Sequence, residues 1–335
     1  MNYTITQLNN TMYNKLNDFI ENTKFGFLRA AWTASSGYLK KYGDIFYYRG
    51  DLIFHYTDLN GLIGILTNKG FWLSDARYLN DAEELYNGAN LAKQLIKKLI
   101  SKQRYNHFKK VLEDTLEKLE TSSFENHYIC SFTMVADTLE HWRAYGENGA
   151  GICIGFSLKQ KTEYPHFFLF PQYYVGKVIY KDQQKTEILL SIIHKYNHEF
   201  MRDLKENKYN IKMYNEEYVN AMFHSLSSVF VNFKNKAFQT EQEVRLIDSS
   251  GNLDFYEKKR YRVSNGVIVP YVCTYETKLK DSSGKRIYPD KLPITKIIVG
   301  PLAKQNIIIQ SIKDFLNDLG YSDVEILKSK IPYRG

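Results

Sequence analysis

Residues 52–66, LIFHYTDLNGLIGIL, predict a strand that leads directly into a helix. The first six residues are mostly apolar or aromatic, which is typical of a short strand. Asp58 is a good helix N-cap residue, and leucine and isoleucine recur after it at helical spacing. We expect Gly70 to end the helix and a second extended segment to begin at Phe71.

Outward from this stretch, strands and helices follow one another in an irregular order. Long helical patterns cover about 81–120 and 183–236, the latter as helices at 183–206 and about 216–236. The other predicted elements are a short helix at 138–145, strands at 127–133, 152–156, 173–180, 243–248, 266–273, 295–299 and 322–327, and a helix at 303–318. Because the regular alternation of a parallel sheet is missing, we expect an α+β fold with a mixed, mostly antiparallel β core. We expect one domain over 1–335, with its core at about 50–300 and the two long helical stretches as insertions.

The composition is that of a globular protein with an excess of basic residues. Hydrophobic residues make up 44% and charged residues 24% of the chain, so a core can form and disorder is not expected. The formal net charge is +8, which is compatible with a nucleic-acid partner. The lysines are scattered, however, and solvated helix faces explain the same charge.

Cysteine usage and hydropathy argue against several classes of protein. Cys130, Cys153 and Cys273 are odd in number, far apart and without a CxxC spacing, so we expect neither disulfides nor a metal site. The N-terminal residues lack an apolar signal core, and no apolar run reaches the roughly 18 residues that a membrane span needs. We therefore expect a cytoplasmic protein with no membrane partner and no metal.

Three polar residues, His55, Tyr56 and Thr57, end the first strand. Side chains at a strand end often reach a ligand cleft, and an imidazole can donate or accept a proton near neutral pH. The alternative is that His55 is bonded to the backbone in the interior and that Thr57 supports the helix cap.

Asn80, Asp81 and Glu83 open the first long helical stretch. Asn80 followed by Glu83 resembles a capping box, and Asp81 suits the positive end of a helix. This structural interpretation competes with a functional one, in which these polar groups bind a substrate.

A third set of polar and aromatic residues lies in the middle of the chain. Ser131 and Thr133 belong to a predicted strand. Trp142 and Tyr145 share one face of a short helix, and such a face is either core or a ligand platform. The glycines within 146–151 lack the Lys and Ser/Thr of a P-loop and are a weak phosphate motif.

The segment 238–247, FQTEQEVRLI, carries the most informative pattern. Glu241 and Glu243 are two positions apart where a strand begins, and Arg245 continues the row. If these residues are extended, they share one face of a sheet, with Val244 and Leu246 on the other. A surface salt-bridge ladder is one explanation. The functional explanation is a carboxylate that stabilises a cationic transition state, with Arg245 binding phosphate or keeping a glutamate ionised.

Cleavage of the glycosidic bond to nicotinamide passes through an oxocarbenium-like state. A site for it needs a clamp on the dinucleotide, a hydroxyl or aromatic contact near the nicotinamide, and one carboxylate at the ribose. His55, the region from Ser131 to Tyr145, and the glutamate pair supply these groups in chain order.

Five short motifs in this order resemble a widespread bacterial domain-of-unknown-function family whose members are often associated with phage defence. The motifs are HYT (55–57), LNDAEE (79–84), CSF (130–132), WRAY (142–145) and EQEVR (241–245), and the resemblance covers roughly 50–300. That family is similar to the ADP-ribosyltransferase superfamily. The segment from His55 to Gly70 also looks like the opening of nucleic-acid-targeting ADP-ribosyltransferase toxins.

The resemblance implies an ADP-ribosyltransferase-like core and NAD as co-substrate. Glu243 would be the catalytic residue and Glu241 would position the acceptor. The residues expected to bind the cofactor are His55, Tyr56, Thr57, Ser131, Thr133, Trp142, Tyr145 and Arg245. The acceptor would be RNA or DNA, or else a protein, and an antitoxin or a phage-derived trigger would be a further partner.

Three functions remain as hypotheses. The first is an NAD-dependent ADP-ribosyltransferase that acts as a toxin or anti-phage effector. The second is a non-catalytic module that senses nucleic acid or a phage product. The third is a metal-dependent nuclease that uses Asp81, Glu241 and Glu243, against which stand the absence of a lysine after the acidic pair and of a paired aspartate motif.

Overall fold

The computed structural model describes residues 25–31, 50–78, 83–125, 127–158, 173–206, 214–248, 253–264, 266–276, 278, 291–302 and 304–333. The chain divides into two compact units. Unit 1 comprises Met1–Asp44, Glu84–Phe124 and Lys181–Phe233, and unit 2 comprises Ile45–Glu83, Glu125–Tyr180 and Lys234–Gly335. The helical stretches predicted as insertions therefore fall almost entirely in one unit, and the predicted β core falls in the other.

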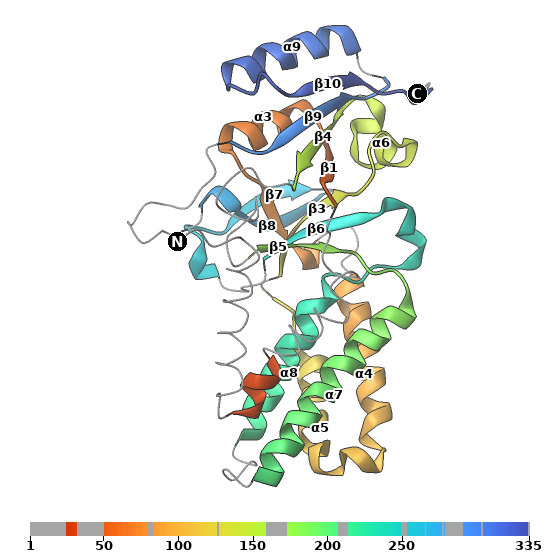
Figure 1. Ribbon diagram of the computed structural model, residues 1–335, viewed down its shortest axis with the longest axis vertical. Coiled ribbons are helices and arrows are strands. Elements are labelled where there is room, and N and C mark those ends of the chain that lie inside the picture. Colours follow the sequence, from red (N-terminus) through yellow and green to blue (C-terminus); the bar gives the residue numbers. More distant parts are fainter. Residues whose placement is uncertain are drawn as a thin grey trace, which may run out of the picture. The chain divides into compact units, whose positions relative to one another are not determined.

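Unit 1 is helical in the part of it that the structure describes. Its long helices are α4 (Glu83–Ile100), α5 (Lys109–Thr121), α7 (Asp182–Glu206) and α8 (Asn215–Phe230), and α8 packs against both α5 and α7 (Figure 1). The stretch predicted as helical at 81–120 contains two helices, because Lys102 is extended and a 3-10 turn, Gln103–Phe108, precedes α5.

A buried ion cluster fixes the described N-terminal segment to these helices. The Arg29 guanidinium bonds to Glu199 at 2.8 Å and to Asp203. Asp203 also accepts hydrogen bonds from the backbone N–H of Gly26 and the hydroxyl of Tyr218, both at 2.7 Å. Because buried charges are costly unless they are paired, this cluster holds the segment in one position.

Unit 2 is built on a ten-stranded sheet in the order β10-β9-β4-β1-β3-β2-β8-β7, with β6 on β3 and β5 on β6. The strands are β1 (Leu52–Thr57), β2 (Trp72–Asp75), β3 (Tyr128–Thr133), β4 (Ile152–Ser157), β5 (Tyr173–Lys177), β6 (Glu243–Asp248), β7 (Arg260–Ser264), β8 (Val267–Cys273), β9 (Ile294–Val299) and β10 (Glu325–Lys328). Among the described pairings only β9–β10 is parallel. The predicted α+β class with a mixed, mostly antiparallel sheet is therefore confirmed.

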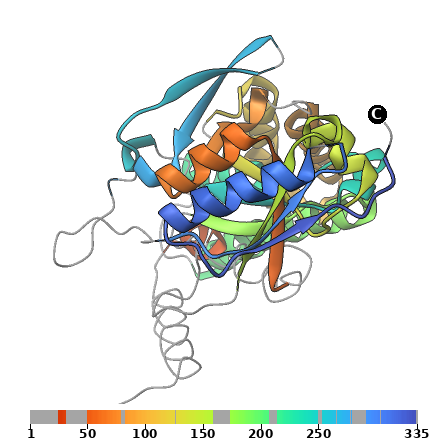
Figure 2. The same ribbon diagram turned by 90° about the horizontal axis from the view of Figure 1, so that it is seen from above.

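Two helices pack on one face of the sheet. Helices α3 (Leu59–Asn68) and α9 (Gln305–Asp318) lie side by side in both ribbon views (Figures 1 and 2). Their buried Leu62 and Ile312 belong to the main core, together with Phe132. We call this side of the sheet the α3–α9 face and the opposite side, which carries the side chain of Glu243, the Glu243 face.

The sheet divides at β3. One edge of β3 pairs with β6 along its length. On the other edge β1 reaches only Thr133, while β2 pairs with Tyr128 and Ile129. Ser131 therefore lies at a fork, between the point where β1 leaves β3 and the point where β2 joins it.

Most elements lie within a few residues of their predicted positions. Asp58 caps α3 as expected, since its carboxylate accepts from the backbone N–H of Gly61 at 2.6 Å. The helix ends one residue earlier than predicted, with Lys69 and not Gly70 in the left-handed conformation. The edge strand β7 was not predicted. The three cysteines are buried and unbonded, and in the described part of the chain no helix is long and apolar enough to cross a membrane.

We predict that Arg29→Ala destabilises the protein, because it leaves two carboxylates buried without their guanidinium. The expected loss in the free energy of unfolding is about 3–5 kcal/mol, measured by urea denaturation. Lys97→Ala is the control, because Lys97 is 60% exposed and its ion-pair partner Glu120 is 47% exposed. Equal losses in both variants would contradict the assignment.

Candidate functional site

The two glutamates of the EQEVR motif meet where a 3-10 helix, Lys236–Glu241, turns into β6. The extended conformation expected for both residues is wrong for Glu241, which ends the 3-10 helix. Gln242 between them has a φ of 43°, a left-handed conformation that residues other than glycine seldom adopt. The chain bends there, and yet the two carboxylates converge on one lysine.

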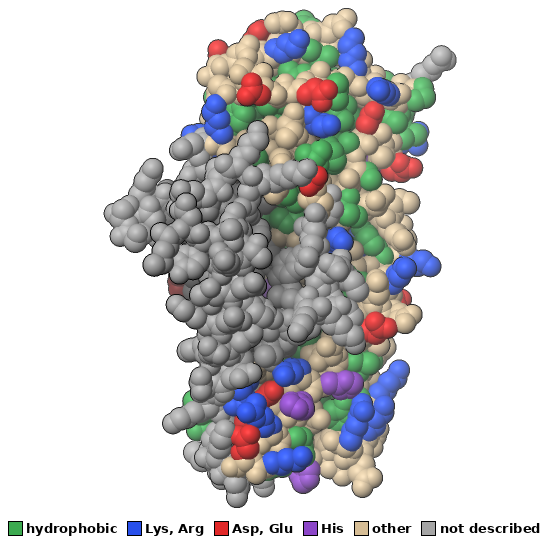
Figure 3. Space-filling model, viewed as in Figure 1, with side chains coloured by type: hydrophobic (Ala, Val, Ile, Leu, Met, Phe, Trp, Pro, Cys, Tyr) green, Lys and Arg blue, Asp and Glu red, His purple; other side chains and the backbone are tan. Residues whose placement is uncertain are grey.

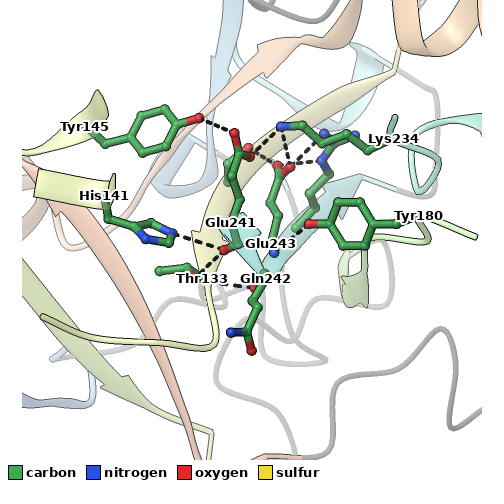
Figure 4. A network of polar contacts seen from close by, with 10 residues as sticks. Thr133, His141, Tyr145, Tyr180, Lys234, Glu241, Gln242 and Glu243 are labelled. Atoms are coloured by element: carbon green, nitrogen blue, oxygen red, sulfur yellow. Dashed lines mark hydrogen bonds and ion pairs between the residues drawn. The ribbon is translucent and has the colours of Figure 1, made fainter. Parts of the chain in front are cut away.

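Lys234 joins the two carboxylates, as Figure 4 shows. Its ammonium group donates to Glu241 at 2.6 Å and to Glu243 at 3.0 Å. Arg245 donates to both oxygens of Glu243, at 2.7 and 2.9 Å. Two cations thus face two anions, and the formal charges of these four groups sum to zero.

Glu243 is buried, and its carboxylate is fully occupied. Its Oε1 accepts from the hydroxyl of Ser131 at 2.6 Å and from Arg245, and its Oε2 accepts from Lys234 and Arg245. Burial by itself raises the pKa of Glu243, but Arg245, Lys234 and the Ser131 hydrogen bond outweigh it and lower the pKa to about 2. The surface salt-bridge ladder is therefore excluded for Glu243 and Arg245, which are 5% and 4% exposed.

Glu241 is the carboxylate that reaches the surface. Its side chain is 18% exposed, and it accepts a hydrogen bond of 2.9 Å from the hydroxyl of Tyr145. Tyr145 ends helix α6 (Leu139–Tyr145) and is itself exposed. Burial of the hydroxyl, and then the charge of Glu241, raise the pKa of Tyr145, so the phenol stays protonated and donates.

The backbone of Glu241 is held by two side chains. His141 Nε2 and the hydroxyl of Thr133 donate to its carbonyl oxygen at 3.0 and 2.8 Å. Burial lowers the pKa of His141, so the ring is neutral near pH 7. Because a carbonyl only accepts, Nε2 carries the proton, and Nδ1 accepts from the hydroxyl of Thr138 at 2.6 Å.

Ser131 is an accessible residue of β3, with its side chain on the Glu243 face. It is exposed, although Cys130 and Phe132 beside it and its strand partner Arg245 are buried. Solvent therefore reaches β3 at this residue, and we call this place the Ser131 position.

His55 approaches the same residue from the other side of the sheet. Its ring lies 5.3 Å from that of Phe132, on the α3–α9 face, and its Nδ1 donates to the carbonyl oxygen of Ser131 at 2.9 Å. Burial lowers the pKa of His55, which favours the neutral ring. His55 and Glu243 therefore both contact Ser131, but their side chains leave the sheet on opposite faces.

The other predicted site residues are buried, half-buried or outside the described residues. Trp142 is fully buried and packs edge-on against Tyr56, which is also buried. Thr57 is half-buried at the end of β1. Asn80 and Asp81 lie outside the described residues, as does the side chain of Glu83, the first residue of α4. The core interpretation therefore applies to Trp142 and Tyr56, whereas Tyr145 on the same short helix faces the site.

Two residues of the site were not predicted. Lys234 precedes the glutamates and lies between α8 and the 3-10 helix, so its meeting with both carboxylates depends on the path of a loop. His141 stands beside Trp142 in the sequence, but its bond to Glu241 spans 100 positions. Within the described ranges no group of three or more His, Cys, Asp or Glu side chains is arranged to hold a metal ion.

We predict that Glu243 makes the stability of the protein sensitive to acid. Its folded pKa of about 2 lies below its ordinary value of 4.5, so its contribution is complete above about pH 4.5 and is lost as the pH falls towards 2. The loss is on the order of 3 kcal/mol. Urea unfolding between pH 2 and 7 should show this loss of stability in the wild type. Glu243→Gln should be less stable at pH 7, and its free energy of unfolding should vary less with pH. If the free energy of unfolding of Glu243→Gln fell with pH as steeply as that of the wild type, the assignment would be contradicted.

Comparison with known proteins gives one family. The model of a family described as "Protein of unknown function (DUF2971)" matches residues 141–246, from α6 to β6. This confirms a resemblance to a family of unknown function over that part of the expected 50–300. His141, Tyr145 and both glutamates fall inside the match, whereas His55 and Ser131 fall outside it. No curated protein and no solved structure matches the chain.

Proposed function

We propose that this protein is an NAD-dependent ADP-ribosyltransferase whose reaction takes place at the Ser131 position. The observation that carries the proposal is the solvent-accessible Ser131 with the Glu241–Tyr145 pair and the Ser131–Glu243 hydrogen bond around it. A carboxylate, a phenol and a small hydroxyl at one accessible place are the groups that nicotinamide cleavage needs near the reacting ribose.

The proposed reaction breaks the bond between C1′ of the ribose and the nicotinamide nitrogen of NAD. Nicotinamide leaves with the bonding electron pair, and positive charge develops on the ribose. A carboxylate beside the ribose stabilises this charge. A nucleophilic oxygen or nitrogen of the acceptor then bonds to C1′ and loses its proton to solvent or to a nearby base.

The contacts of the two glutamates support Glu241 as the carboxylate at the ribose. Glu243 already makes hydrogen bonds with both oxygens and is buried, so a ligand would have to displace Arg245 or Lys234 to reach it. Glu241 keeps part of its surface open. This proposal reverses the sequence-based preference for Glu243, which becomes a positioning residue that acts on Lys234 and Ser131.

His55 is assigned a positioning role as well. It bonds to the carbonyl of Ser131 from the α3–α9 face, where the side chains of Ser131 and Glu243 do not point. It thereby fixes the edge of β3 at the fork. We propose that it keeps Ser131 in place and does not itself clamp the dinucleotide.

A nucleic acid is the acceptor that we favour, because of the net charge of +8. Figure 3 shows that Lys and Arg side chains on the drawn face are interspersed with Asp and Glu and form no continuous patch. A protein acceptor therefore remains the comparison in the experiment.

A non-catalytic ligand-binding module is the second candidate. It is favoured by the pairing of both carboxylates with Lys234, since a neutralised carboxylate stabilises a cation less well. The two candidates differ in whether nicotinamide is released.

The test measures nicotinamide release and label transfer from NAD labelled in its adenylate half, with RNA, DNA or protein as acceptor. We predict that Glu241→Gln, assayed well below its unfolding midpoint, lowers the rate about 100-fold or more. Glu140→Gln, an exposed glutamate of α6, is the matched control and should keep the wild-type rate. No nicotinamide release by the wild type, or an equal rate in Glu241→Gln, would refute the proposal.

A further inference from the structure

We propose that Trp72 and Arg262 form a subsite for the ADP half of a nucleotide ligand, in which the indole stacks on the base and the guanidinium binds the diphosphate. The identity of the ligand as NAD rests on the proposed function. The two residues come from β2 and β7, outside the glutamate cluster, and they are joined by Ser74.

Strand register places these residues on the Glu243 face. Ser74 pairs with Ile129 of β3, which stands two positions before Ser131, and Ser74 also pairs with Tyr271 of β8. Directly paired residues and residues two apart share a face, so Trp72 lies on the same side of the sheet as Ser131. Trp72 begins β2 at the fork. If the antiparallel β2–β3 pairing continued for two more residues, Trp72 would stand opposite Ser131.

Trp72 is a rigid and accessible aromatic group. Its side chain is 45% exposed, although Leu73 and Ser74 after it are buried. Its indole N–H donates to the hydroxyl of Tyr275 at 3.0 Å, and its ring lies 4.7 Å from that of Tyr271 at 33°. The indole is thus fixed on one side and open on the other. Base stacking on such a ring loses little side-chain entropy on binding.

Arg262 supplies a hydrogen-bond donor that has no partner. One of its terminal nitrogens donates to the hydroxyl of Ser74 at 3.0 Å, while its Nε is buried and makes no hydrogen bond. Arg260, two residues earlier on the same face, is different, because its guanidinium is held by both oxygens of Glu276. No carboxylate among the described residues pairs with Arg262. The guanidinium carries a positive charge that no described carboxylate neutralises, and a phosphate group would supply the opposite charge.

The spacing of the two groups suits one nucleotide. Trp72 and Ser74 are two positions apart on the same strand face, which separates their Cα atoms by roughly 7 Å. The guanidinium of Arg262 lies at Ser74. A base on the indole therefore leaves its phosphates within reach of the guanidinium, and the ligand lies beside the Ser131 position.

Calorimetric titration with ADP, adenosine and inorganic pyrophosphate tests the subsite on the full-length chain. We predict that Trp72→Ala weakens ADP and adenosine binding about tenfold or more and leaves pyrophosphate binding unchanged. Arg262→Gln should weaken ADP and pyrophosphate binding and spare adenosine. Trp72→Phe, which keeps an aromatic ring, should retain most of the affinity. This variant tests the role of stacking even if Trp72→Ala fails to fold.

Two control variants lie on the same hairpin. Tyr261→Ala removes a side chain that is 59% exposed on the opposite face, and Lys259→Gln removes an exposed charge beside it. Neither should change ADP binding by more than twofold. Equal weakening by Lys259→Gln and Arg262→Gln would show a non-specific charge effect and would overturn the proposal, as would ADP affinity that is unchanged in Trp72→Ala and Arg262→Gln.

The subsite and the proposed reaction can fail separately. ADP binding that depends on Trp72 and Arg262, in a wild type that releases no nicotinamide, supports the subsite and refutes the transferase. Nicotinamide release with an unchanged KM for NAD in both variants supports the transferase and refutes the subsite.

Discussion

A single buried ammonium group organises this end of the sheet. Lys234 is 5% exposed and lies between the carboxylates of Glu241 and Glu243, and its backbone N–H also donates to the carbonyl of Ile179. A charge in that position is tolerated only while its partners stay in place. The bend at Gln242, the 3-10 helix before it and the start of β6 are therefore tied to the same interaction. Tyr145 and His141 then attach helix α6 to the arrangement through Glu241.

The parts of the site that local periodicity controls could be predicted. The alternation of Glu243 and Arg245 with Val244 and Leu246 predicted two faces, and the structure buries the apolar pair in the main core with the charged pair opposite. Asp58 as a helix cap followed from residue type alone. These features depend on neighbours within a few positions, which is the range that a sequence pattern describes.

The parts that depend on pairing between distant segments could not be predicted. The face on which His55 lies is set by its register with β4 and by the single contact of β1 with Thr133. A shift of one residue in that register would have put His55 on the Glu243 face, and nothing in residues 52–57 distinguishes the two cases. The position of Lys234 depends in the same way on a loop. The order of motifs along the chain therefore indicated which segments meet, but not from which side of the sheet.

The balance of charge in the Glu243 cluster has an evolutionary consequence. Two cations and two anions share one buried place, so the loss of any one of them leaves a net charge in the interior. A replacement at one position is tolerated most easily when an opposite charge disappears with it. Related chains are therefore expected to change Lys234, Glu241, Glu243 and Arg245 in compensating pairs, and a homologue that lacks the lysine should also lack one of the two glutamates.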